Sequence, residues 1–268
     1  MNDNQTTTQP ENAVKLGRDP RLRTQDFAAL AELEEEYASQ IEENTRLAVE
    51  AIRKQERDDA RQIIEPYRIT ALSNIPKLIP VVKRHNTIIC SEGNISAVVG
   101  EAKSKKTFLC TAMVGSLLDN KQRQQFGIQP NRCKVLWVDT EQSPAHIQKL
   151  LFRINILGGL PHNTPDPTIY MAALREATPS DRMNIVINGI TAHNPKLVVI
   201  DGISDLMNNT NCLEESEALV AKLLSLSSIH NCHIMCVLHT NPNSDKARGH
   251  LGSTLMRKAE SVIYVHII

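Results

Sequence analysis

One segment near the middle of the chain constrains its fold more than any other. Residues 98–109 read VVGEAKSKKTFL, so an apolar stretch runs into a glycine, five residues follow, and Lys106 and Thr107 open a second apolar stretch. A strand, then Gly-x-x-x-x-x-Lys-Thr, then a helix is the pattern of a loop whose backbone N–H groups cradle phosphate at a helix N-terminus. The segment therefore predicts an α/β domain that binds a nucleotide.

The side chains of this loop have different expected roles. The Lys106 ammonium would reach the β- and γ-phosphates, and the Thr107 hydroxyl would hold Mg²⁺. Lys105 stands where the second glycine of such loops is usual; its N–H can still donate, but a positive φ there would strain it. The alternative is a lysine-rich turn without function. The residues expected to contact the nucleotide are Gly100, Ala102, Lys103, Ser104, Lys105, Lys106, Thr107 and Phe108.

Apolar strands alternate with helical segments after residue 93. The strands hold almost no polar residues, which is typical of a parallel sheet covered by helices on both faces. Residues 68–93 are expected to lead into this core, and residues 241–252 to form a polar loop. The expected strands are 95–99, 134–138, 168–172, 197–200, 234–238 and 262–265, and the expected helices are 106–118, 143–157, 179–193, 213–229 and 253–259.

The chain before the core divides into two parts. Residues 1–23 are polar and predict a disordered lead-in, whereas residues 24–66 predict a helical arm, capped by Thr24 and ended by Pro66. Residues 1–66 hold 9 Lys and Arg against 15 Asp and Glu, and residues 67–268 hold 21 against 15. The helix either packs on the next domain or grips a neighbouring subunit. The ATPase-like core would span residues 67–268 and can face a polyanion.

Polar groups follow three of the apolar strands. Glu141 comes three residues after a strand end and is the expected general base, with Asp139 between the strand and Glu141. Asp201 ends another strand and is the expected Mg²⁺ partner, with Asp205 as a weaker candidate. His239 ends a third strand. Because the carboxyl ends of parallel strands line one edge of the sheet, all should lie on the nucleotide side.

This order of motifs resembles the RecA-like P-loop ATPases, and within them the branch of RepA-type hexameric helicases and mobile-element AAA-family ATPases. The resemblance covers about residues 70–268, roughly three quarters of the chain. The segments that carry it are GEAKSKKT (100–107), VDTE (138–141), VID (199–201), HTNP (239–242) and RGHLGSTLMRKAESVI (248–263).

The resemblance implies a RecA-like core preceded by a long helix, with ATP and Mg²⁺ as cofactors. It gives Lys106 and Glu141 catalytic roles and makes His239 a switch between nucleotide and DNA states. Arg248 or Lys246 would either reach a neighbour's γ-phosphate as a finger or touch DNA. Single-stranded DNA and further copies of the chain, as in a hexamer, are the implied partners. Relatives carry further strands beyond this point, so the end at Ile268 is expected to be either natural or a truncation.

The composition of the chain excludes several classes of protein. Aromatic residues make up 3% of the chain, too few for a base-stacking platform along single strands. No apolar window of spanning length exists, the first residues lack a signal-peptide core, and six cysteines form no CxxC pair, so a cytoplasmic protein without membrane contact is expected. The His230–Cys236 group is a weak zinc candidate. Two alternatives to a DNA-acting motor are a nucleotide-dependent loader and a small-molecule kinase.

Overall fold

The chain forms two units, Met1–Ile75 and Pro76–Ile268, which are described separately. The computed structural model describes residues 24–75, 77–241, 244 and 246–266, without the side chains of residues 24–26. The expected disordered lead-in, residues 1–23, lies outside the described residues. No helix in the described ranges combines the length and apolar character that crossing a bilayer requires.

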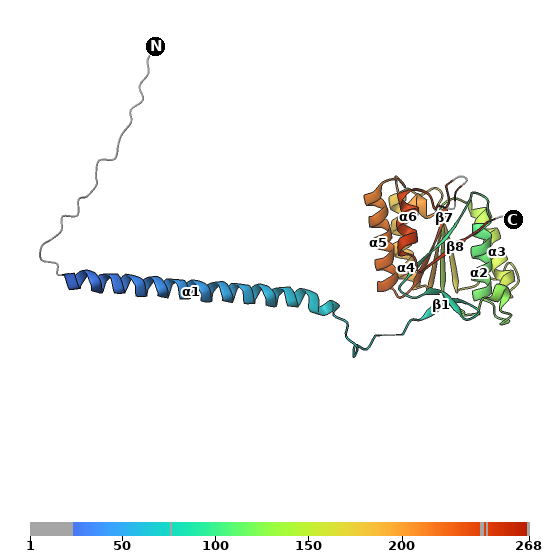
Figure 1. The fold of residues 1–268 in the computed structure, drawn as a ribbon. Coiled ribbons are helices and arrows are strands. Elements are labelled where there is room, and N and C mark those ends of the chain that lie inside the picture. The colour runs from blue at the N-terminus through green and yellow to red at the C-terminus, as the bar shows by residue number, and fades with distance from the viewer. Residues whose placement is uncertain (1–23, 76, 242–243, 245, 267–268) are drawn as a thin grey trace, which may run out of the picture. The chain divides into compact units, whose positions relative to one another are not determined.

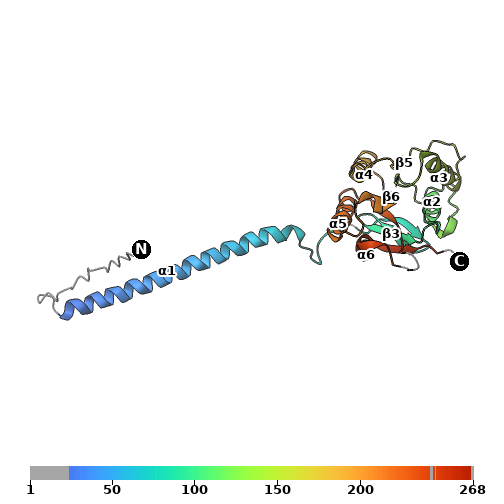
Figure 2. The same ribbon diagram turned by 90° about the horizontal axis from the view of Figure 1, so that it is seen from above.

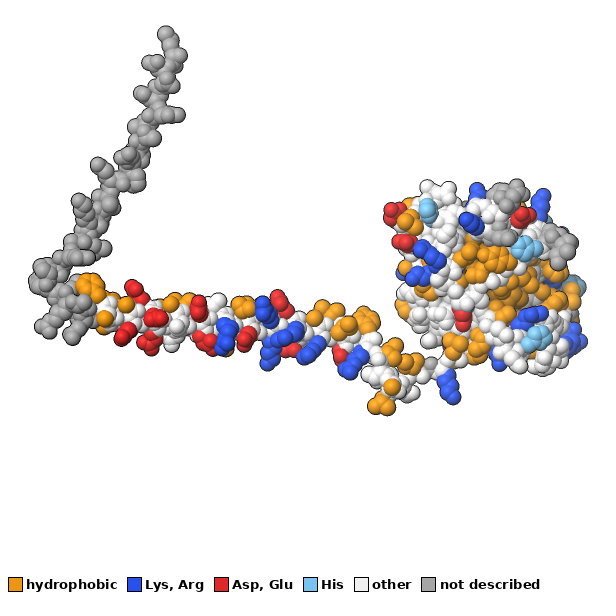
Figure 3. Space-filling view, viewed as in Figure 1, with side chains coloured by type: hydrophobic (Ala, Val, Ile, Leu, Met, Phe, Trp, Pro, Cys, Tyr) orange, Lys and Arg blue, Asp and Glu red, His pale blue; other side chains and the backbone are white. Residues whose placement is uncertain are grey.

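Within its described residues, 24–75, the first unit contains one long helix followed by a 3-10 turn. Helix α1 (Thr24–Ile64) confirms the predicted long helix, and η1 (Glu65–Tyr67) follows it. At about 1.5 Å per residue, such a helix is roughly 60 Å long. Acidic side chains gather over its first half and basic ones over its second half, and pairs one turn apart, such as Arg46 with Glu43, brace its surface (Figure 3).

The second unit is built on a six-stranded parallel sheet with the order β5-β4-β6-β7-β3-β8. This confirms the predicted α/β class. The strands are β3 (Ile95–Gly100), β4 (Val135–Asp139), β5 (Ile169–Ala173), β6 (Leu197–Asp201), β7 (His233–His239) and β8 (Ser261–Tyr264). The helices are α2 (Lys106–Leu117), α3 (Pro144–Leu157), α4 (Pro179–His193), α5 (Leu213–Ile229) and α6 (Gly249–Lys258), with short 3-10 turns η2 (Gln125–Gly127) and η3 (Ile203–Leu206).

Helices cover both faces of the sheet (Figures 1 and 2). Alternate residues of each strand point to opposite faces. Val98 and Trp137 therefore pack with α2 and α3, whereas Ala97 and Leu136 pack with α4, α5 and α6. Strands β3, β4, β6 and most of β7 are buried on both faces, which explains why their sequences are continuously apolar.

Two local predictions were wrong. Residues 80–91, expected as part of a lead-in, form an antiparallel hairpin of β1 (Pro80–Arg84) and β2 (Thr87–Ser91). Its turn uses His85 with φ of 50° instead of the Gly that marks most tight turns. The loop expected over 241–252 ends early, since α6 begins at Gly249. Two glycines lower its helix propensity, but buried Leu251 packs in the core and sustains the first turn.

A buried histidine ties the hairpin to the sheet. His233 in β7 is fully buried; one ring nitrogen lies 2.9 Å from the Ser91 carbonyl oxygen and the other 2.8 Å from Ser96 Oγ. Glu260 accepts from both the N–H and the hydroxyl of Ser91. These bonds place His233 in the fold and not in a metal site, and the described residues contain no cluster of three His, Cys, Asp or Glu side chains that could hold an ion.

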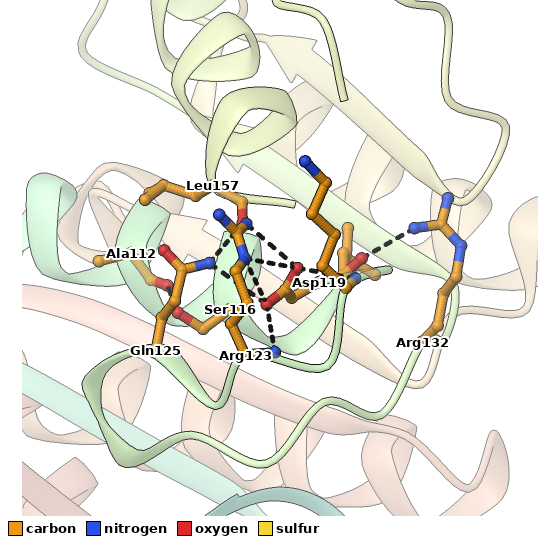
Figure 4. Close-up of polar contacts among 9 residues, drawn as sticks. Ala112, Ser116, Asp119, Arg123, Gln125, Arg132 and Leu157 are labelled. Carbon is orange, nitrogen blue, oxygen red and sulfur yellow. Dashed lines mark hydrogen bonds and ion pairs between the residues drawn. The ribbon is translucent and has the colours of Figure 1, made fainter. Parts of the chain in front are cut away.

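The loop after α2 is organised around the buried carboxylate of Asp119 (Figure 4). It accepts hydrogen bonds from the backbone N–H groups of Lys121 and Arg123 and from the Arg123 guanidinium. The same guanidinium also donates to the Leu157 carbonyl at the end of α3. One buried acid thus fixes the loop and joins two helices on one face of the sheet.

Candidate active site

The predicted phosphate loop connects β3 to α2 at the carboxyl edge of the sheet. Gly100 ends the strand, and a Cβ atom there would lie 2.4 Å from the Val265 carbonyl oxygen, so only glycine fits. Lys103 and Lys105 both adopt left-handed φ values, of 65° and 74°. This turn bends the backbone into α2, whose first-turn N–H groups have no partner within the helix and can bind an anion.

A buried polar atom in this loop shows that the site fits phosphate. Ser104 is 3% exposed and its hydroxyl has no hydrogen-bond partner in the described structure. It lines a cavity of about 490 Å³ together with the rest of the loop and the ends of β6 and β7. A buried hydroxyl without a partner is costly unless a ligand satisfies it. Oxygen atoms of a phosphate group meet that need.

Lys106 already uses its three donor positions on protein acceptors. Its ammonium lies 3.0 Å from the Gly100 carbonyl oxygen, 2.8 Å from that of Glu101 and 3.0 Å from His239 Nδ1. Burial lowers the pKa of Lys106, while the nearby carboxylates of Asp201 and Glu141 oppose that shift. Because the ammonium donates to Nδ1, the remaining proton of neutral His239 lies on Nε2.

The predicted Mg²⁺ pair is in direct contact. Thr107 Oγ1 donates to Asp201 Oδ2 at 2.7 Å. Burial, together with the charges of Asp139 and Glu141, raises the pKa of Asp201 to about 6 despite that hydrogen bond. The buried Asp201 carboxylate, with two further carboxylates nearby, favours binding of a cation. A hydroxyl, one carboxylate, phosphate oxygens and water form an oxygen shell of the kind that Mg²⁺ uses.

Glu141 is presented by a turn that Asp139 organises. Asp139 Oδ1 accepts from the backbone N–H groups of Glu141 and Gln142, and its Oδ2 accepts from the Gln142 amide. Asp139 therefore shapes the turn, and the Glu141 side chain extends into the cavity. Glu141 Oε1 lies 3.6 Å from His239 Nε2. The interaction with His239, together with the positive charge of Lys106, lowers the pKa of Glu141 despite partial burial.

Arg248 lies in a second cavity. This cavity, of about 330 Å³, shares His239 and Leu238 with the nucleotide cavity and is lined by polar residues of η3 and the segment after it. Asp205 lines the same cavity, and its carboxylate accepts a hydrogen bond from Thr140 Oγ1 at 2.9 Å. Lys246 is exposed on the loop before α6. The structure thus gathers Lys106, Thr107, Glu141, Asp201 and His239 in one cavity and places Arg248 in the next.

Sequence reasoning missed two cavity residues on α3, Leu150 and Arg153. Their spacing of three residues places them on one face of the predicted helix. That signal was available in the sequence, but nothing in it tells which of the helix faces meets the phosphate loop. Only the packing of α3 beside α2 brings them to the nucleotide cavity.

A comparison with family models decides the classification, because the AAA domain model matches residues 72–245, more than half of the chain. The chain belongs to the AAA domain family. The match supports a nucleotide-binding P-loop ATPase and covers every gathered residue from Gly100 to His239. A search of curated proteins gave no match. Arg248 lies beyond the matched part of this AAA domain.

Proposed function

We propose that this AAA domain protein is a DNA-dependent, helicase-like ATPase that works as an oligomer in the replication or mobilisation of a plasmid or mobile element. The observation that carries the ATPase part is the gathering of Lys106, Thr107, Glu141 and Asp201 in one cavity. The DNA and oligomer parts rest on the second cavity and on the resemblance to RepA-type helicases.

The residues of the site can perform hydrolysis as a division of tasks. Bound Mg²⁺ would supply charge neutralisation on the phosphate oxygens. The loop N–H groups and Lys106 hold the phosphates, while Thr107 and Asp201 provide ligands for the ion. Glu141 accepts the proton of the attacking water, and its lowered pKa keeps it ionised at neutral pH.

His239 links the two cavities. One of its nitrogens contacts Lys106, the other faces Glu141, and the residue lines the cavity that holds Arg248. When Lys106 turns to a phosphate, His239 loses that partner and is free to reorient. A DNA phosphate bound beside Arg248 in the second cavity would contact the His239 imidazole from that cavity. This contact supports coupling between hydrolysis and DNA.

One observation favours an alternative, a nucleotide-gated loader with little turnover. Lys106 must give up protein acceptors before it can bind phosphate, and Lys105 holds a strained backbone conformation in the same loop. The lost Lys106 contacts reduce the free energy gained from the nucleotide. Such a protein would bind ATP and change its contacts without rapid hydrolysis.

Steady-state ATP hydrolysis with and without single-stranded DNA separates these functions. The proposal predicts turnover that rises several-fold with DNA and disappears in Lys106→Ala. Turnover unchanged by any nucleic acid would overturn the DNA-dependent function. Tight ATP binding with negligible turnover under both conditions would identify the loader.

A further inference from the structure

Helix α1 carries an apolar stripe that no described residue of the first unit covers. Hydrophobic side chains follow one another along the helix (Figure 3), and every residue from 27 to 57 is exposed. At 3.6 residues per turn, the large ones between residues 27 and 52 fall mostly within about 60° of a single line. The members of this stripe, each at least 53% exposed, are Phe27, Leu30, Leu33, Tyr37, Ile41 and Ile52.

A stripe of this length needs a long partner. Most of the stability of a protein helix comes from packing of its apolar face, so a bare stripe favours association. Residues 27–52 extend over about 39 Å at 1.5 Å per residue. The longest other helix of the described chain, α5, has 17 residues and packs in the core of the second unit. Helix α1 of a second copy has the matching length.

The charges of α1 determine the direction in which two copies can pair. Residues 24–44 hold seven acidic side chains and no basic one, whereas residues 45–64 hold five basic and four acidic side chains. In a parallel pair in register, each acidic residue lies at the level of the same residue of the second copy, and like charges repel. In an antiparallel pair, the acidic half of each helix lies along the half that holds the basic residues.

One antiparallel register satisfies both the stripe and the charges. It places Ile41 at the level of Ala48, and Tyr37 then lies at the level of Ile52. No acidic residue of α1 lies at the level of another in this register. The acidic residues Glu32, Glu35, Glu36 and Glu43 lie at the levels of Arg57, Lys54, Arg53 and Arg46, respectively. The two copies of Asn44, which interrupts the stripe, meet beside the two-fold axis, where their amides can hydrogen-bond and fix the register.

We propose that α1 of one copy packs antiparallel against α1 of a second copy through the apolar stripe, as a two-fold symmetric helix pair. The pairing goes beyond the proposed function, since it requires neither nucleotide nor DNA and uses no residue of the nucleotide cavity. Its failure would therefore leave the proposed hydrolysis untouched.

Analytical ultracentrifugation of the full chain without nucleotide tests the pairing. The wild-type chain should have the mass of two copies or of an even multiple. Ile41→Glu puts a charge in the stripe and should raise the Kd of the pair at least about tenfold. Ala28→Glu, the matched control, adds the same charge on the opposite side of the helix and should leave that Kd within about twofold. A monomeric wild-type chain, as when the second unit covers the stripe, would overturn the pairing. Association of Ile41→Glu equal to that of the wild type would overturn it too.

Disulfide trapping tests the direction of the pair without a charge in the stripe. Leu30 and Asp59 lie at the same level in the antiparallel register, whereas Leu30 meets its own copy in a parallel pair. Under mild oxidation, Leu30→Cys mixed with Asp59→Cys should form a disulfide-linked pair of chains. Leu30→Cys alone should form no more than the wild-type chain, whose six cysteines provide the blank. Linkage of Leu30→Cys alone without linkage between the two variants would overturn the antiparallel direction, and linkage in neither sample would overturn the pairing.

Discussion

At the scale of single residues, the ammonium of Lys106 controls access to the site. It is held by two carbonyl oxygens and by His239 Nδ1 at 3.0 Å, so a phosphate must compete with the protein for its donors. The carbonyl contacts lie within the loop and can shift with it. His239 comes from β7, the strand next to β3, and its contact can be removed alone.

Replacement of His239 by Ala should therefore tighten nucleotide binding. The hydrogen bond from Lys106 to His239, with a net value of about 1 kcal/mol, no longer competes with the phosphate. This corresponds to a roughly fivefold lower Kd. Hydrolysis should fall, because Glu141 loses its neighbour. His239→Gln, which restores an acceptor, should return the affinity toward that of the wild type. Fluorescent-nucleotide titration measures both variants, and weaker binding in His239→Ala would contradict the competition.

Lys105 supplies a second test at this scale. Its φ of 74° is one that residues other than glycine adopt at a cost of about 1–2 kcal/mol. Glycine relieves that strain but loses about 0.5–1 kcal/mol through the freedom of the unfolded chain. Lys105→Gly should therefore raise the free energy of unfolding by up to about 1 kcal/mol in urea titrations, whereas Lys105→Ala should not. A lower free energy of unfolding for Lys105→Gly than for the wild type would contradict the strain assigned to Lys105.

At the scale of elements, the buried Asp119 carboxylate makes the α2 loop sensitive to acid. Burial opposes its ionisation, but hydrogen bonds from Arg123 and two backbone N–H groups outweigh it and lower its pKa to about 2, from 3.8. A folded-state pKa below the unfolded one gives stability that is present above pH 4 and is lost as the pH falls toward 2. The contribution is about 2 kcal/mol.

Asp119→Asn should thus cost about 2 kcal/mol at pH 7 and much less near pH 2. Urea unfolding at both pH values measures the difference between the two chains. A loss of equal size at pH 7 and pH 2 would show that the charge of Asp119 is not what stabilises the loop.

The elements that sequence could predict share one physical property. Strands such as β6 are apolar up to their last residue because both faces are covered. The bounds of helices α4 and α5 were predicted correctly. The β1–β2 hairpin could not be predicted because His85 takes the position where glycine would signal a turn. The start of α6 could not either, since burial of Leu251 overrides two glycines.

The residues of the candidate site also divide into those that sequence could predict and those that it could not. Lys106, Thr107, Glu141 and Asp201 follow strands or open a helix, and the parallel sheet brings such positions to one edge. Arg153 lies in the third turn of α3, where only the packing of α3 against α2 decides what it faces. The contact of Lys106 with His239 joins residues 133 positions apart and has no sequence signature.

At the scale of the whole molecule, the question is whether copies of the chain complete each other's sites. Arg248 lies outside the cavity that holds Glu141, so within one chain it does not line the place where hydrolysis is proposed. A finger role requires a second copy, whereas a DNA role does not. The two roles predict opposite results when inactive variants are mixed.

If Arg248 acts across a subunit interface, Arg248→Ala and Glu141→Gln should each be inactive alone and regain hydrolysis when mixed. The first supplies intact cavities and the second supplies intact arginines. Mixing Lys106→Ala with Glu141→Gln is the control that cannot regain activity, because neither contributes a working cavity. If the mixture of Arg248→Ala and Glu141→Gln does not regain hydrolysis although light scattering shows oligomers, the finger role is contradicted. The DNA-contact role of Arg248 then stands.

The central claim is that Glu141 activates water beside a phosphate group held by Lys106. The most direct measurement is the rate of Mg-ATP hydrolysis by the wild-type chain and by Glu141→Gln, with nucleotide binding followed in parallel. Loss of a general base predicts a rate lower by about 10²–10⁴-fold with ATP binding retained. Hydrolysis by Glu141→Gln at the wild-type rate would contradict the assignment of the site.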